Sequence, residues 1–164
     1  HLLRRDRSDG KIGNYPSGVT RAEGEVAMEQ RADPLEGLSE DDVKRGVEAW
    51  LRAAGWEVKV KWGRDRGIDI EAARGNARWI IEAKGCGSRD QMRVNYFLSM
   101  LGELLQRMED PIARYSIALP DMKQFRGLWA RLPNLAKSRT TISALFVDAT
   151  GRVDEVWSGT STAV

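Results

Sequence analysis

GIDIEAARGNARWIIEAK, residues 67–84, is the stretch of sequence that decides the fold. The Gly75-Asn76 dipeptide lies between two runs of β-prone residues, which is typical of a hairpin with a two-residue turn. This turn pairs residue 74 with residue 77 and places Asp69 directly opposite Glu82. Because side chains alternate between faces along a strand, Lys84 shares the face of Glu82. The predicted register therefore gathers two carboxylates and one lysine on one patch.

The facing carboxylates indicate a metal site. Like charges directly opposite each other destabilise a strand pair, and a divalent cation between them would reverse that effect. We therefore predict Asp69 and Glu82 as ligands of Mg²⁺, with Mn²⁺ as a substitute and the backbone carbonyl of Ala83 as a further ligand. Lys84 would orient or help to deprotonate a water and screen the negative charge that develops when a phosphodiester is hydrolysed.

A helix is predicted to begin at Ser39, where Ser39-Glu40-Asp41-Asp42 resembles a capping box with an acidic first turn. An apolar stripe follows at helical spacing, and Gly55 ends the helix. Glu48 lies at the edge of this stripe, so we predict that it binds a second ion or a metal-bound water. The alternative is that Glu48 pairs with Arg45 or Arg52.

The remaining pattern predicts a mixed α/β domain. Strands are expected at 56–62, 114–119, 141–147 and 152–157, besides the hairpin. Further helices are expected from 88 or 89 to Pro111, with Glu103 and Arg107 as an ordinary i, i+4 pair, and from a capping Asp121 to 132. The order αβββαβαββ predicts a sheet with helices on both faces and a parallel crossover through the second helix. We expect a weakly ordered tail at 1–37, one domain at 38–158 and a short tail at 159–164.

Composition excludes several classes of chemistry. Among 164 residues the only histidine is His1, which excludes Ser-His-Asp and Cys-His catalysis and histidine-based zinc sites. Cys86 is the only cysteine, so no internal disulfide forms and a reducing, cytoplasmic setting is expected. No apolar run of about 18 residues is present, so we expect no membrane association.

The net charge of +2 conceals a basic segment. The segment between residues 111 and 140 contains six basic residues and only one acidic residue, Asp121. Such a surface suits a phosphate backbone, although a solvated helix face is the alternative. We predict that four basic side chains contact nucleic acid: Arg64, Arg66, Lys123 and Arg126.

The Gly67-Ile68-Asp69 and Glu82-Ala83-Lys84 segments, on consecutive strands after a helix that carries Glu48, resemble the PD-(D/E)XK nuclease superfamily. Within it, the chain is most similar to the group of Mrr-like restriction enzymes and archaeal Holliday-junction resolvases, in which Gly-x-Asp replaces Pro-Asp. The resemblance covers Ser39 to Leu119. It implies a restriction-endonuclease-like fold, Mg²⁺-dependent hydrolysis of DNA, a core of Asp69, Glu82 and Lys84, and Glu48 as an accessory ligand.

Gln91 follows Lys84 near the start of the second helix, where RecB-type members of the superfamily carry Gln-x-x-x-Tyr. Here Asn95 holds the tyrosine position and Tyr96 follows it. We predict that Gln91 contacts the scissile phosphate or a metal-bound water. Three functions stay open: a DNA nuclease in restriction, recombination or repair, alone or as a homodimer; a nuclease subunit of a larger complex; and a catalytically silent nucleic-acid-binding or scaffold module.

Overall fold

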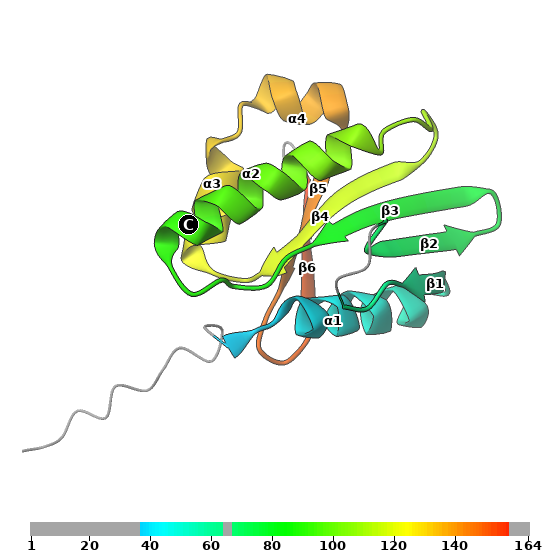
Figure 1. Cartoon of the computed structure of the whole chain (residues 1–164). Helices are drawn as coiled ribbons and strands as arrows, with labels where there is room; N and C mark the ends of the chain where they lie inside the picture. The colour runs from blue at the N-terminus through cyan, green and yellow to red at the C-terminus, as the bar shows by residue number, and fades with distance from the viewer. Residues whose placement is uncertain (1–36, 64–66, 158–164) are drawn as a thin grey trace, which may run out of the picture. The chain divides into compact units, whose positions relative to one another are not determined.

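A computed structural model describes residues 37–63 and 67–157, all of which belong to one compact unit (Figure 1). The elements are α1 (Glu40–Ala53), β1 (Glu57–Val60), β2 (Ile70–Arg74), β3 (Ala77–Ala83), α2 (Asp90–Gln106), β4 (Arg114–Pro120), α3 (Lys123–Arg131), α4 (Asn134–Thr140), β5 (Ser143–Val147) and β6 (Val153–Val156). Among these described residues, no helix combines the length and the apolar character needed to cross a membrane.

The strands form one six-stranded sheet in sequence order, β1 to β6. The two central pairs, β3–β4 and β4–β5, are parallel, and the pairs β1–β2, β2–β3 and β5–β6 are antiparallel. The parallel β3–β4 pair is joined through α2, as the crossover prediction required. The predicted α/β class, a mixed sheet flanked by helices, is therefore confirmed.

The hairpin register is also confirmed. Arg74 pairs with Ala77, and Ile70 pairs with Ile81. Gly75 has a φ of 59°, the left-handed conformation that a tight turn demands and that glycine adopts without strain. Asp69 lies one residue before β2, where its carbonyl accepts a hydrogen bond of 2.8 Å from the backbone N–H of Lys61.

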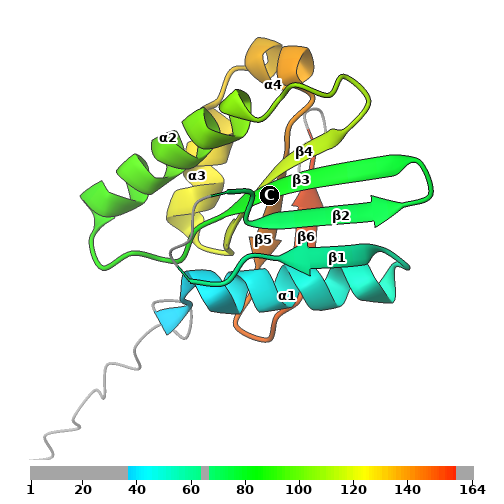
Figure 2. The ribbon, with the colours of Figure 1, turned by 45° about the vertical axis from the view of Figure 1, so that its right-hand side comes forward.

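The sheet is covered on both faces (Figures 1 and 2). α1 begins with the predicted capping box between Ser39 and Asp42, and packs its apolar stripe of Val43, Val47 and Leu51 against one face. α2 and α3 bury their apolar side chains against the other face. Two separate hydrophobic cores thus cover the two faces of the sheet. The open end of the β2–β3 hairpin, where Asp69 precedes β2, lies in the layer between them.

A chain of hydrogen bonds crosses the centre of the sheet through side chains. The indole N–H of Trp79 donates to Ser116 Oγ over 2.8 Å, and Ser116 and Ser143 hydroxyls lie 2.6 Å apart. Ser143 in turn donates to Glu155 over 2.9 Å. These four side chains come from β3, β4, β5 and β6. Each buried hydroxyl is therefore satisfied by a side chain from a neighbouring strand.

Two details of the sequence prediction are wrong. Helix α4 was not expected, because its seven residues are too few to show a helical period and no side chain caps it. Asp121 does not cap α3, which instead begins after Met122 without a side-chain cap. The Asp121 carboxylate binds Arg126, whose guanidinium offers stronger charge-assisted hydrogen bonds than a helix N-terminus does. The predicted tails, 1–37 and 159–164, lie outside the described residues except for Gly37.

Candidate active site

The site is built where the end of β3 meets the start of α1. A Cβ added to Gly85 would lie 2.7 Å from the backbone nitrogen of Glu40, closer than real atoms approach. The backbone N–H of Cys86 donates to the Leu38 carbonyl over 3.0 Å. Only glycine allows this contact, which brings Lys84 beside the first turn of α1.

Asp69 enters this corner from the residue before β2 and is 8% exposed. Its Oδ2 accepts a hydrogen bond of 2.9 Å from the Ala83 N–H. Its Oδ1 lies 2.8 Å from Lys44 Nζ. The carboxylate is thus held by β3 on one side and by α1 on the other.

Lys44 is fully buried on α1, and its ammonium is surrounded by oxygen atoms. Besides Asp69, it contacts Glu40 Oε1 at 2.7 Å and donates to the Lys61 carbonyl over 2.9 Å. Burial alone would lower the pKa of Lys44, but hydrogen bonds and charge from Asp69 and Glu40 outweigh burial and raise it. Lys44 is therefore a permanent cation of the site.

Glu82 is 1% exposed on β3 and forms an ion pair with Arg107, which follows α2. The Nη2 of Arg107 also donates to the Gly67 carbonyl over 2.8 Å. Burial and the negative charge of Asp69 raise the pKa of Glu82 to about 7, against the opposing effect of Arg107. The two predicted carboxylates are thus close enough to influence each other's ionisation.

Lys84 completes the cluster. Its Nζ lies 3.4 Å from Glu40 Oε2 and 3.9 Å from Glu103 Oε2, so it stands between α1 and α2. Its side chain is 21% exposed, so part of it reaches solvent. The structure therefore brings Asp69, Glu82 and Lys84 to one end of the β2–β3 hairpin.

The structure does not bring Glu48 or Gln91 into this cluster. Glu48 forms an ion pair with Arg52 at 2.8 Å, the alternative left open by the sequence. The acid that α1 supplies is Glu40, because the Gly85 contact sets the first turn of the helix beside β3. Gln91 is exposed in the first turn of α2, about 24 Å along the helix axis from Arg107.

The predicted nucleic-acid contacts are only partly available. Arg64 and Arg66 lie outside the described residues, and Lys123 is exposed at the start of α3. Arg126 is instead an internal clamp: it binds Asp121, lies 2.8 Å from Asp154 Oδ2 and stacks 4.5 Å from the Phe146 ring centre.

The basic segment between residues 111 and 140 is likewise not a uniform surface. Arg114 forms an ion pair of 2.7 Å with Glu155 and stacks on Trp79. Lys137 is buried against Trp129, and burial lowers its pKa. Among the six basic residues, Lys123, Arg131 and Arg139 remain exposed.

Sequence reasoning missed four residues of the cluster: Glu40, Lys44, Glu103 and Arg107. One signal was present for Lys44, because it falls on the apolar stripe of α1 beside Val43 and Val47, where a lysine requires buried partners. Glu103 and Arg107 were predicted to pair with each other. Instead Glu103 faces Lys84, and Arg107 binds Glu82.

The carboxylates of the site fit a Mg²⁺ ion that takes only two protein side chains as ligands. Within residues 37–63 and 67–157, no three Asp, Glu, His or Cys side chains are grouped to hold a metal ion. Mg²⁺, however, is commonly held by one or two carboxylates and completed by water and substrate oxygens rather than by an all-protein cage. Asp69 and Glu82 are such a pair: both are buried, and burial together with the negative charge of Asp69 raises the pKa of Glu82.

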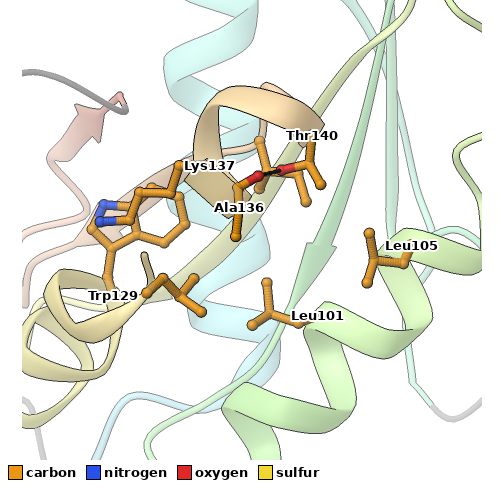
Figure 3. Close-up of a pocket in the computed structure, with 8 residues that line it drawn as sticks. Leu101, Leu105, Trp129, Ala136, Lys137 and Thr140 are labelled. Atoms are coloured by element: carbon orange, nitrogen blue, oxygen red, sulfur yellow. Dashed lines mark hydrogen bonds between the residues drawn. The ribbon is translucent and has the colours of Figure 1, made fainter. Parts of the chain in front are cut away.

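A separate apolar pocket lies between α2, α3 and α4 (Figure 3). Its volume is about 110 Å³, and its lining includes Leu101, Leu105, Trp129 and Lys137. Residues two apart on a helix point in nearly opposite directions, so Leu101 and Leu105 project away from the Glu103 side of α2. The pocket is therefore on the opposite side of α2 from the carboxylates.

Comparisons with known proteins support the fold. No protein-family profile matches the chain, and no curated protein resembles it in sequence. The fold is similar to the crystal structure of an XisH family protein from Nostoc punctiforme, with a TM-score of 0.50 and 18% identity. The similarity covers 71% of this chain and 98% of that protein. The architecture is consistent with a restriction-endonuclease-like fold. At this identity the likeness concerns the fold alone.

Proposed function

We propose that the protein is a metal-dependent nuclease that hydrolyses DNA phosphodiester bonds. The observation that carries the proposal is the meeting of Asp69, Glu82 and Lys84 at one end of the β2–β3 hairpin, in a sheet consistent with a restriction-endonuclease-like fold. In the PD-(D/E)XK nucleases that the sequence resembles, residues of these types in these positions form the catalytic core.

Each residue has a distinct role in this proposal. Asp69 and Glu82 would hold Mg²⁺ or Mn²⁺, and Glu40 takes the accessory place on α1 that the sequence had assigned to Glu48. The bound cation would lower the pKa of water and screen the phosphate charge. Lys84, whose partly exposed side chain lies beside Glu40, would orient the attacking water and stabilise negative charge on the phosphate.

A test is cleavage of plasmid, linear duplex and single-stranded DNA by the full chain with Mg²⁺ or Mn²⁺. Lys84→Ala and Asp69→Ala are each expected to reduce cleavage by about a hundredfold or more. Lys59→Ala provides a matched control, because Lys59 is an exposed lysine of β1. Its cleavage rate should equal that of the wild type.

A second candidate function is a silent DNA-binding module. The observation that favours it is that Lys44 and Arg107 already neutralise Asp69 and Glu82. DNA binding without cleavage in the presence of either metal would support this module, or a nuclease subunit that requires a larger complex. Cleavage that persists in both alanine variants would overturn the assigned core.

A further inference from the structure

The surroundings of Lys44 are those of a bound cation. Its ammonium has three oxygen neighbours, Glu40 Oε1 at 2.7 Å, Asp69 Oδ1 at 2.8 Å and the Lys61 carbonyl at 2.9 Å. These oxygens come from α1, from the residue before β2 and from the residue after β1. An all-oxygen set of two carboxylates and one carbonyl is also what a hard divalent cation prefers.

Unlike a metal ion, this cation is covalently attached to the chain and cannot dissociate. The Lys44 side chain is 0% exposed, whereas those of Arg107 and Lys84 are 29% and 21% exposed. Arg107 and Lys84 therefore retain contact with solvent. Lys44 cannot leave without exposing Asp69 and breaking the contact between α1 and the hairpin.

The charges of the cluster limit what else can bind. Its carboxylates are Glu40, Asp69, Glu82 and Glu103, and its cations are Lys44, Lys84 and Arg107. With all groups ionised the cluster carries one net negative charge. One divalent cation leaves it at one positive charge, while a second would add repulsion at short range, from Lys44 above all.

We propose that Lys44 is a positioning residue that permanently occupies the place of a second divalent cation beside Asp69, so that the site accepts a single metal ion. This inference rests on the proposed metal-dependent function. It predicts that the Asp69 carboxylate contacts both cations: Oδ1 binds the Lys44 ammonium, and the lone pairs that remain bind the metal ion. It also predicts that the metal affinity of the site is set by the charge at position 44.

The test counts Mn²⁺ ions bound to the full chain by electron paramagnetic resonance, without DNA. Wild type is expected to bind one ion. Lys44→Met removes the charge but keeps an unbranched side chain, so it should bind a second ion or bind the first about tenfold more tightly. Lys44→Arg restores the charge and should return the count to one. Lys59→Met, at an exposed position, should match the wild type.

Two results would overturn the inference while leaving a metal-dependent nuclease in place. One is two ions bound by the wild type, a measurement that holds even if Lys44→Met does not fold. The other is equal count and affinity in wild type and a folded Lys44→Met. If neither the wild type nor any variant binds Mn²⁺, the proposed metal-dependent function is itself overturned. Thermal unfolding of each variant establishes which of them are folded.

Discussion

Lys44 and Asp69 form a buried ion pair, with Nζ 2.8 Å from Oδ1. One partner comes from the middle of α1 and the other from the residue before β2, so the pair joins two parts of the chain that are distant in sequence. A buried pair of this kind contributes little compared with an apolar contact, but breaking it leaves one charge without its partner.

Asp69→Asn is therefore expected to lower the free energy of unfolding by about 3 kcal/mol, because the Lys44 ammonium stays buried with less compensation. Urea denaturation without metal measures the change. Asp90→Asn is the matched control, since the Asp90 side chain is 82% exposed and its pair with Arg93 should be worth less than about 1 kcal/mol. Equal losses in the two variants would contradict the structural role of the buried pair.

Glu82 makes stability depend on pH. Its pKa rises from the ordinary 4.5 to about 7, so the folded protein holds the proton more tightly than the unfolded chain does. The stability that Glu82 contributes is complete below pH 4.5 and is lost as the pH rises to about 7. The full shift corresponds to about 3 kcal/mol.

The check is the free energy of unfolding at several pH values between 4 and 8, measured without metal and compared with Glu82→Gln. The glutamine variant cannot titrate, so its curve should be flatter across this window. If the wild type and the variant have parallel curves, the pKa of Glu82 is not raised.

Gly85 and Gly102 should respond to alanine in opposite directions. At Gly85 the added Cβ would lie 2.7 Å from the Glu40 backbone nitrogen, and backbone cannot yield as a side chain would. We expect Gly85→Ala to lower the free energy of unfolding by about 2 kcal/mol and to reduce cleavage, because Lys84 is displaced from Glu40.

Gly102→Ala should instead stabilise the protein by about 0.5 to 1 kcal/mol, because the position is within α2 and nothing lies within 4 Å of the new Cβ. Both values come from urea denaturation, and cleavage by this variant should be unchanged. Stabilisation by both alanines would show that β3 and α1 are not in close contact.

Alanine variants of Lys123 and Arg126 should differ, because we expect Lys123 to contact DNA whereas Arg126 forms ion pairs within the protein. Lys123→Ala should weaken DNA binding and lower the slope of log K against log salt by about 1, without a change in stability. Arg126→Ala should lower stability by about 1 kcal/mol through the loss of its ion pairs and its ring contact with Phe146, with little effect on that slope. Fluorescence anisotropy across a salt series measures binding. A changed slope in Arg126→Ala would restore its predicted role.

The hairpin was predictable because every signal for it is local. The turn residues, the alternation and the short loop between Arg74 and Ala77 fix the register without help from the rest of the molecule. The approach of Asp69 to Glu82 follows from that register. The fold class was predictable for a similar reason, because the strand and helix periods alternate clearly along the chain.

The partners of the site residues were not predictable in the same way. On α1, Glu40 and Glu48 both lie where a helix edge can reach the sheet, and the choice depends on a backbone contact with Gly85 that no local pattern reports. On α2, the spacing of Glu103 and Arg107 permits a pair on the helix surface. In the folded protein, however, Glu103 faces Lys84 of the neighbouring segment and Arg107 pairs with Glu82 of β3.

The hydrogen-bonded chain from Trp79 through Ser116 and Ser143 to Glu155 solves a problem of alignment. Strands joined by a tight turn inherit their offset from the turn, but β3, β4 and β5 are parallel and their long connections impose none. A slip of one residue would separate these polar groups inside an apolar layer. The hydrogen bonds between these side chains thus set the register of the parallel strands, which the connecting segments do not.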